Sequence, residues 1–304
     1  MSAVPTLALN TDRFNYGYPA VFITLLVWSG FFLSLRAGAN SAMTMVDLSI
    51  LRFVLPALCF STVVYKSRKK IQKVPIKYLL GIIAGSGFPF FYLGATGMQY
   101  ASVSYGSLLI PGTLPLFVSA IAVTLFSEPF STHRKIGLFS IGVGIAIMIS
   151  TSLIDFDYLQ LKGVVLFLFG SAMWAMFTIC MRMSGLNAIE GAGITAIGSL
   201  LLLGGYCVIM PFEINMFTVS SSELLIQFLI QGVCVGLIAG FCYGFAISRL
   251  GAEMTAAFGS LTPVVASLLA IPLFAEMLTS TTVIGIIFIC GGSLLASQIF
   301  KKSH

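Results

Sequence analysis

The chain has 304 residues, of which 58% are hydrophobic and 9% are charged, and its mean hydropathy is +1.03. This small number of charged and polar side chains cannot cover the surface of a soluble globular domain. The composition therefore indicates an integral membrane protein that lies in a lipid bilayer. The net charge of +6 does not indicate nucleic-acid binding, because the basic residues lie almost entirely in the breaks between apolar runs.

After an N-terminal segment, residues 1–18, the chain divides into ten apolar runs that are separated by short polar breaks. A membrane-spanning helix needs about 20 mostly apolar residues, and continuous runs favour helices over the alternating pattern of barrel strands. The sequence therefore predicts an all-α integral membrane fold with ten transmembrane helices. The runs lie at 19–35, 46–65, 78–97, 104–126, 136–153, 163–183, 191–210, 224–247, 254–274 and 283–300.

The basic residues predict how the chain is oriented. Six of the sixteen Lys and Arg residues lie in one break, residues 65–77. With the N-terminus in the cytoplasm, thirteen basic residues fall in cytoplasmic segments and two, Arg36 and Lys162, fall outside. Basic loops remain on the cytoplasmic side of a membrane. We therefore expect a multi-pass protein of the cell (inner) membrane with both termini in the cytoplasm.

Two spaced patterns occur twice in the chain. The pattern P-x12-E-x8-G begins at Pro115 and again at Pro263, 148 positions later. The pattern W-x7-R begins at Trp28 and again at Trp174, 146 positions later. A pattern that returns at a nearly constant offset indicates an internal duplication.

The duplication divides the chain into two five-helix repeats, residues 19–153 and 163–300. Because five is an odd number, the second repeat must enter the membrane from the opposite side. This predicts inverted topology about a pseudo-two-fold axis in the membrane plane. Two such halves enclose a site near the bilayer midplane and can rock around it, which is the geometry of a transporter that works by alternating access.

Prolines and glutamates mark the fourth and ninth predicted helices. Pro111, Pro115 and Pro263 each remove a backbone donor within an apolar run, which predicts kinks. Glu128 and Glu276 follow these helices and precede "ST" and "TS", which resemble caps of the next helices. The structural interpretation of both glutamates, as cap and hairpin brace, stands beside the alternative of a role in transport.

The doubled pattern, together with "LRF" at 51–53 and "MQYASVSYGSLLIPGTLP" at 98–115, resembles the EamA family of the drug/metabolite transporter superfamily, from Trp28 to about Ser297. The resemblance implies a ten-helix, exporter-like carrier whose central cavity is lined by helices one, three, four, six, eight and nine. It also implies substrates that are small metabolites, amino acids among them. Where the family often has W-G-x-N, this chain has W-S-G-F at 28–31 and lacks the asparagine.

Arg52 and four aromatic residues are the candidate substrate contacts. An arginine inside an apolar span is a candidate functional residue; it either pairs structurally with another helix or attracts an anionic substrate group. Aromatic rings in helices that the family places around the cavity either pack against neighbouring helices or bind the substrate. These aromatic residues are Trp28, Tyr92, Trp174 and Tyr243.

Four glycines recur at every fourth residue of the eighth predicted helix, Gly232, Gly236, Gly240 and Gly244. Small residues at this spacing let helices approach closely; alternatively, they leave room in the cavity or let this helix slide. Gly81 and Gly85 form a shorter version in the third predicted helix.

The sequence predicts a secondary transporter that exports small-molecule metabolites such as amino acids, without setting an oligomeric state. No Asp or Glu lies in the middle of a predicted helix, which argues against the main alternative, a proton-coupled multidrug exporter. A membrane-embedded enzyme is the second alternative, but the spans contain no histidine and no paired Asp motif. The cysteines show no CxxC pattern, and there is no P-loop, so neither a metal nor another cofactor is expected.

Overall fold

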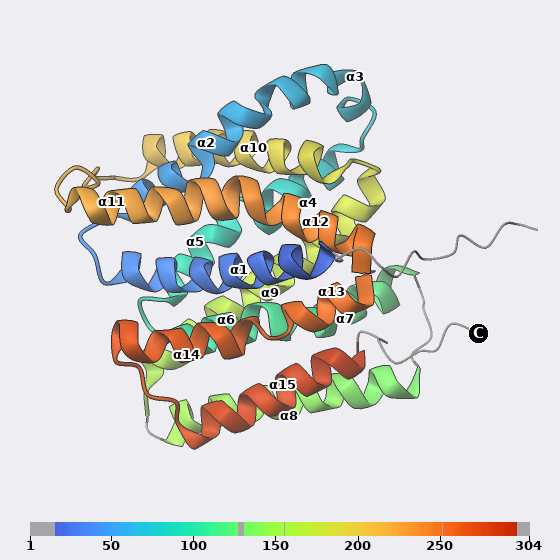
Figure 1. The fold of residues 1–304 in the computed structure, drawn as a ribbon, viewed down its shortest axis with the longest axis vertical. Helices are drawn as coiled ribbons and strands as arrows, with labels where there is room; N and C mark the ends of the chain where they lie inside the picture. Colours follow the sequence, from blue (N-terminus) through green and yellow to red (C-terminus); the bar gives the residue numbers. More distant parts are fainter. Residues whose placement is uncertain (1–15, 127–130, 155, 251, 297–304) are drawn as a thin grey trace, which may run out of the picture.

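The computed structural model describes residues 16–126, 131–154, 156–250 and 252–296. Within these ranges every regular element is a helix, and most of the helices run side by side, across the longest axis of the molecule, in one bundle (Figure 1). The predicted all-helical fold is therefore confirmed. The elements are α1 (Gly17–Ala39), α2 (Met45–Lys66), α3 (Arg68–Ile71), α4 (Ile76–Ser86), α5 (Phe88–Gly97), α6 (Val103–Gly112), α7 (Leu114–Phe126), α8 (Thr132–Ile154), α9 (Tyr158–Ser184), α10 (Ala188–Ile209), α11 (Ser221–Gln227), η1 (Phe228–Ile238, a π-helix), α12 (Ala239–Leu250), α13 (Ala252–Gly259), α14 (Thr262–Phe274) and α15 (Ser280–Ala296).

Among the residues that the structure describes, eight helical rods are long and apolar enough to cross a bilayer. Five are single helices, and three are composite: α4 with α5, α6 with part of α7, and α11 with η1 and α12. The last two predicted runs form shorter helices, since α14 has 13 residues and α15 has 17. Helix length and composition in the described residues thus support a multi-pass membrane protein with eight candidate spans, and the predicted count of ten is not confirmed.

The predicted proline kinks take the form of breaks between short helices. α6 ends one residue before Thr113, and α7 begins at Leu114 with Pro115 in its first turn. Pro263 lies in the first turn of α14, after the chain leaves α13. A proline is tolerated at these positions because a first-turn backbone nitrogen has no partner within the helix. Pro111 remains inside α6, near its end.

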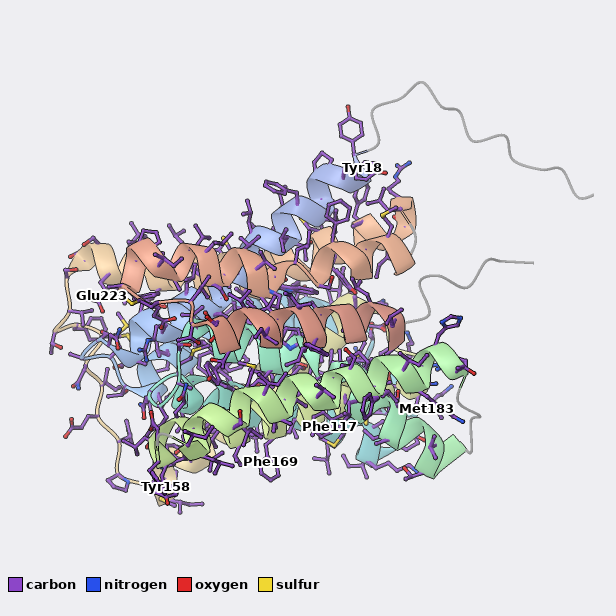
Figure 2. The ribbon with its side chains drawn as sticks, turned by 90° about the horizontal axis from the view of Figure 1, so that it is seen from below. Tyr18, Phe117, Tyr158, Phe169, Met183 and Glu223 are labelled. Atoms are coloured by element: carbon purple, nitrogen blue, oxygen red, sulfur yellow. The ribbon has the colours of Figure 1, made fainter. Side chains whose placement is uncertain are left out.

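The first helices of the two predicted repeats run in opposite directions. In Figure 2, Tyr18 at the start of α1 and Met183 near the end of α9 lie toward one end of the bundle, whereas Tyr158 at the start of α9 lies at the other end. The start of α1 and the described end of α15 lie at the same end (Figure 1). α1 therefore enters the bundle from the end at which α9 leaves it.

The helices of one half pack mainly against those of the other half. α8 packs against α15, and α2 packs against α10. α9 packs against α4 and α5, while α1 packs against η1 and α12. The pairings are reciprocal. The pairs α2–α10 and α8–α15 each join a helix to its predicted counterpart in the other half, and the packing of α9 against α4 and α5 corresponds to that of α1 against η1 and α12.

Gly232, Gly236, Gly240 and Gly244 form a row that we call the glycine ridge, and only the first two of these glycines contact α2. A Cβ atom on Gly232 would lie 2.8 Å from the Leu51 carbonyl oxygen, and one on Gly236 would lie 2.5 Å from Pro56 Cγ. No atom lies within 4 Å of the Cβ position at Gly240 or Gly244. Close helix approach is therefore seen at Gly232 and Gly236, and the other two glycines face open space.

We expect Gly85→Ala to lower the free energy of unfolding by about 1–3 kcal/mol, which is typical of overpacking. The added methyl group would lie 2.7 Å from the Phe177 backbone nitrogen and even closer to the Met173 carbonyl oxygen, so α4 and α9 would have to separate. Gly240→Ala is the matched control, since its methyl group meets no atom within 4 Å. Thermal unfolding of both variants in detergent tests this, and equal stability losses would contradict it.

Candidate functional site

Three of the four predicted aromatic candidates lie together between α1, α9 and α12. The ring centroids of Trp28 on α1 and Trp174 on α9 lie 6.4 Å apart in an edge-to-face arrangement. The ring of Tyr243 on α12 lies 5.0 Å from Trp28, and Phe90 on α5 lies 5.1 Å from Trp174. This aromatic cluster, Trp28, Phe90, Trp174 and Tyr243, joins the four rods that correspond to predicted helices one, three, six and eight.

The structure does not bring Tyr92 into the aromatic cluster. Tyr92 lies instead beside Phe88 and Tyr206, with ring centroids 6.0 Å and 6.1 Å away. Tyr206 belongs to α10, so Tyr92 packs at the interface between α5 and α10.

Arg52 is held by a backbone carbonyl group and by two aromatic rings. Its Nη1 donates a hydrogen bond to the Gln231 carbonyl oxygen at 3.1 Å. Its guanidinium carbon lies 5.7 Å from the Phe53 ring centroid and 6.0 Å from that of Phe31. In the described part of the chain no carboxylate pairs with Arg52. These contacts accommodate the charge inside the bundle and leave it without a counter-ion.

A buried polar network extends from Arg52 to α1, and the sequence did not predict it. The Gln227 side-chain amide donates to the Ser34 carbonyl oxygen at 3.0 Å, and the Gln231 amide donates to Ser34 Oγ at 3.0 Å. The Ser34 hydroxyl group in turn donates to Gln227 Oε1. Gln231 is 0% exposed, and its Oε1 has no hydrogen-bond partner. The sequence signal was a pair of glutamines four residues apart in an apolar run.

Gln231 lies within η1, the π-helix that links α11 to α12. π-helical segments occur frequently at functional sites. Here the segment carries both the side chain with an unpaired acceptor atom and the carbonyl group that binds Arg52. An unpaired buried acceptor is costly unless another group donates to it, which makes this network a candidate contact for a polar substrate group.

Glu276 joins three segments at the end of the bundle where α1 ends. Its carboxylate accepts hydrogen bonds from the Val103 backbone N–H at 3.0 Å and 3.2 Å, and it forms an ion pair with Arg36 Nε at 3.1 Å. Arg36 Nη1 also donates to the Met98 carbonyl oxygen at 2.6 Å. Since Val103 begins α6, the carboxylate lies at a helix N-terminus, where negative charge is favourable. We call Arg36, Glu276 and Val103 the α1–α6 clamp.

The predicted helix caps are present next to the two glutamates. Thr279 Oγ1 accepts from the Thr282 backbone N–H at 3.2 Å, and Ser131 Oγ accepts from the Arg134 backbone N–H at 3.3 Å. Glu276 itself caps α6 rather than α15, because its hydrogen bonds go to Val103. Glu128 lies outside the described residues.

Burial raises the pKa of the Glu276 carboxyl group above 4.5, and this effect outweighs the opposing interactions with the Val103 N–H and Arg36. The folded state therefore binds this proton more tightly than the unfolded state does. Above the raised pKa the buried carboxylate lowers stability, and this penalty declines as the pH falls toward 4.5.

We expect wild-type stability to rise relative to that of Glu276→Gln as the pH is lowered from above the raised pKa of Glu276 toward 4.5, because the carboxylate becomes protonated and the amide does not titrate. Melting temperatures of both proteins over the same pH series measure the difference. A difference that shrinks on acidification would mean that the ion pair with Arg36 outweighs the burial of the carboxyl group.

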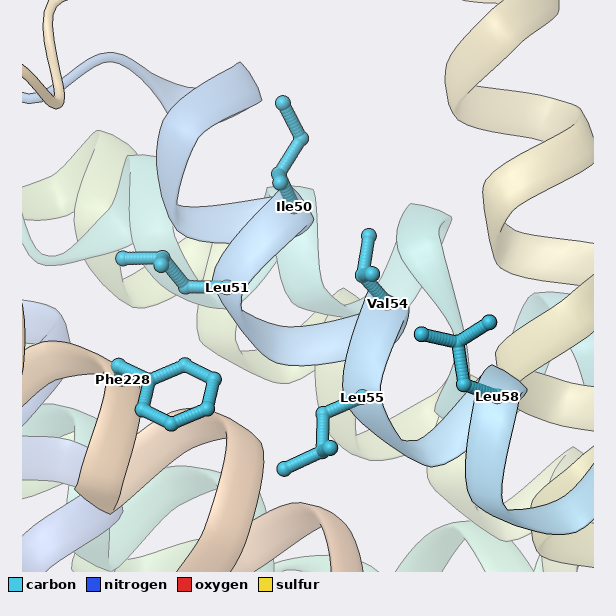
Figure 3. A pocket seen from close by; sticks show the side chains of 6 residues that line it. All are labelled: Ile50, Leu51, Val54, Leu55, Leu58 and Phe228. Carbon is cyan, nitrogen blue, oxygen red and sulfur yellow. The ribbon is translucent and has the colours of Figure 1, made fainter.

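A groove of about 220 Å³ lies between α2 and η1 (Figure 3). The α2 residues that line it are near Arg52 in the sequence, but they carry no charge. All the side chains that line it are apolar, so it offers no partner to a polar substrate. The lining residues are Ile50, Leu51, Val54, Leu55, Leu58 and Phe228.

Comparison with known proteins identifies relatives of the chain. The model of the EamA-like transporter family matches residues 161–298. The uncharacterized transporter YoaV of Bacillus subtilis (strain 168) is 21% identical over 287 residues, which cover 91% of this chain and 95% of that protein. A solved crystal structure shares the fold with a TM-score of 0.62 at 16% identity, covering 94% of this chain and 99% of the other. The second half of the chain is therefore similar to the EamA-like transporter family, in agreement with the resemblance seen in its sequence.

Proposed function

We propose that this protein is a transporter of the EamA-like family, a secondary carrier that exports small metabolites, such as amino acids, by alternating access. One observation carries the proposal: Trp28 and Trp174, which hold equivalent positions in the duplicated W-x7-R pattern, contact each other across antiparallel helices α1 and α9. Equivalent residues that meet in this way lie on or near a pseudo-two-fold axis. A central site on such an axis can be reached in turn from each side of the membrane.

The proposal includes ten membrane-crossing rods in two inverted five-helix repeats. The reciprocal pairings of α2 with α10 and of α8 with α15 support this arrangement, because each joins a helix to its own counterpart. α14 and α15 cross the bilayer as the ninth and tenth rods, with α13 extending the ninth. Both termini lie on the cytoplasmic side of the cell membrane, in accord with the distribution of basic residues.

Two groups of side chains suit a small metabolite with an apolar part and a charged part. The aromatic cluster offers ring faces and edges to an apolar or aromatic portion. Arg52 offers a cation without a carboxylate partner among the described residues, and Gln231 offers an unpaired acceptor atom. A carboxylate and an amino group on one molecule would match this pair of polar groups.

Transport by the reconstituted protein tests this proposal. Purified protein in liposomes is expected to move labelled amino acids in the absence of ATP, and Trp174→Ala is expected to reduce that movement while the protein remains folded. Movement of cationic dyes but of no metabolite in a broad panel would favour a multidrug exporter. Chemical conversion of a panel member without its movement would indicate a membrane-embedded enzyme.

A separate experiment tests the topology. A single cysteine placed at Asp157, between α8 and α9, is expected to react with a membrane-impermeant thiol reagent added to intact cells, after the native cysteines have been replaced. A cysteine placed at Lys69 in α3 is expected to react only after the membrane is opened. Reaction of both sites in intact cells, or of Lys69 alone, would contradict the inverted-repeat arrangement with cytoplasmic termini.

A further inference from the structure

The connection between α2 and α4 carries an unusual concentration of positive charge. Residues 65–77 contain six basic residues and no acidic residue. Every one of the six is exposed. The short helix α3 forms the middle of this connection and lies at the margin of the bundle (Figure 1). We call the six residues the basic loop: Lys66, Arg68, Lys69, Lys70, Lys73 and Lys77.

One of the six residues fixes the loop to the bundle, and the other five have no acidic partner among the described residues. Lys70 Nζ forms an ion pair with Glu190 Oε2 at 2.6 Å. Glu190 also accepts a hydrogen bond from the Asn187 backbone N–H at 2.8 Å, so this anchor is part of the start of α10. Across the described ranges, the other five cations form no ion pair. The loop therefore holds five uncompensated positive charges in a defined position.

Exposed aromatic and apolar side chains lie beside the charges of the basic loop. Tyr65 and Ile76 are 66% and 67% exposed, as expected of side chains at a lipid-facing surface. Arg68 lies over the Tyr65 ring at 4.3 Å, and Lys77 lies over the Tyr78 ring at 5.0 Å. Tyrosine is enriched at membrane–water interfaces. The cations are thus next to side chains that favour the interface.

The duplicated architecture shows that this connection does not require basic residues. The equivalent connection of the second half, residues 210–220 between α10 and α11, contains no Lys or Arg and includes Glu213. Both connections join two long apolar rods in the same protein. The positive charge of the basic loop is therefore not needed to join two rods, and only one side of the molecule carries it.

We propose that the basic loop binds the phosphate groups of anionic phospholipids in the adjoining membrane leaflet. Clusters of four to eight Lys and Arg residues beside a transmembrane helix attract anionic lipids. The loop meets this description, and the ion pair between Lys70 and Glu190 holds it against the bundle while the remaining side chains are free to contact lipid. Lipid bound there would link α2, α4 and α10 at one end of the bundle.

The test measures stabilisation by defined lipids on the purified full-length protein in neutral detergent. Binding to the folded state raises the melting temperature. Short-chain phosphatidylglycerol is expected to raise the melting temperature of the wild-type protein more than phosphatidylcholine does at the same concentration. The variant Lys66→Gln/Lys69→Gln/Lys73→Gln is expected to lose at least half of this difference, because it removes three unpaired cations and retains Lys70.

The matched control removes three exposed basic residues elsewhere, Lys135→Gln/Arg182→Gln/Arg249→Gln, and is expected to keep the difference between the two lipids. Salt at about 1 M, where the Debye length is about 3 Å, is expected to abolish it. Equal responses of the wild-type protein to both lipids, or equal losses in both variants, would overturn the proposal. So would an equal shift with inorganic phosphate, which would assign the loop to a soluble anion. No arm of the test depends on transport activity.

Discussion

Replacing Arg52 by glutamine is expected to reduce transport per folded molecule by one to two orders of magnitude. The guanidinium group donates to the Gln231 carbonyl oxygen at 3.1 Å and supplies positive charge beside the buried polar network. A hydrogen bond from a charged group contributes about 1.5–3 kcal/mol, and about 1.4 kcal/mol corresponds to a tenfold change. The measurement is initial transport by a known amount of monodisperse protein in liposomes.

Arg52→Lys is the companion variant and is expected to retain part of the activity, because it keeps the positive charge but loses the planar donor group. Val54→Ala, two residues along α2 and exposed toward the groove, controls for a general effect of altering this helix. Normal transport by Arg52→Gln would remove Arg52 from the substrate site and leave the aromatic cluster as the better candidate. Low yield of folded protein with normal specific transport would make Arg52 a structural brace.

Breaking the α1–α6 clamp is expected to have the second large effect. Glu276→Gln leaves Arg36 without its counter-charge, and Arg36→Gln leaves a carboxylate whose side chain is only 11% exposed. Removing one partner of a buried, charged hydrogen bond costs about 1.5–3 kcal/mol. Arg36→Gln should therefore show a lower melting temperature than the wild-type protein, and it should lose more stability than Glu276→Gln, because the glutamine in the latter also removes the cost of burying a carboxylate.

The double variant Arg36→Gln/Glu276→Gln provides the control for the clamp. It leaves no unpaired charge, so its loss of stability is expected to be smaller than the sum of the two single losses. Strictly additive losses would show that the ion pair contributes nothing, and that each residue acts only through its own backbone contact, Met98 for Arg36 and Val103 for Glu276.

Features that depend on hydropathy and spacing could be predicted from the sequence. The apolar runs correspond to helical rods, because apolar residues in a bilayer must satisfy their backbone groups locally. Ser131 and Thr279 cap α8 and α15 because a hydroxyl group directly before a helix can reach its free N–H groups. Trp28 and Trp174, which the family resemblance places in helices around one cavity, contact each other in the structure.

Features that depend on contacts between distant segments could not be predicted. Gln227 and Gln231 became candidates only when the fold placed Ser34 and Arg52 beside them. Tyr92 shares its rod with Phe90, yet it turns toward α10 while Phe90 meets the aromatic cluster. A sequence indicates which residues belong to a helix, but the side that faces the centre depends on how the neighbouring helices pack.

The glycine ridge shows a further limit of reasoning from spacing. A spacing of four residues keeps side chains on one face only while the hydrogen bonds follow the α pattern from residue i to i+4. η1 lies across the ridge and follows the π pattern, from i to i+5. In agreement with this change of pattern, Gly232 and Gly236 in η1 contact α2, whereas Gly240 and Gly244 in α12 have no atom within 4 Å of their Cβ positions.

The π-helix also gives the rod that contains it a way to twist. Gln231 lies within η1, and Tyr243 lies beyond it on α12. Changing the hydrogen bonds of η1 to the α pattern would rotate α12 about its axis relative to α11. Tyr243 would then turn away from Trp28 while Gln227 kept its bonds to Ser34. Torsion within a single rod would thus change the aromatic cluster independently of any rocking of the two halves.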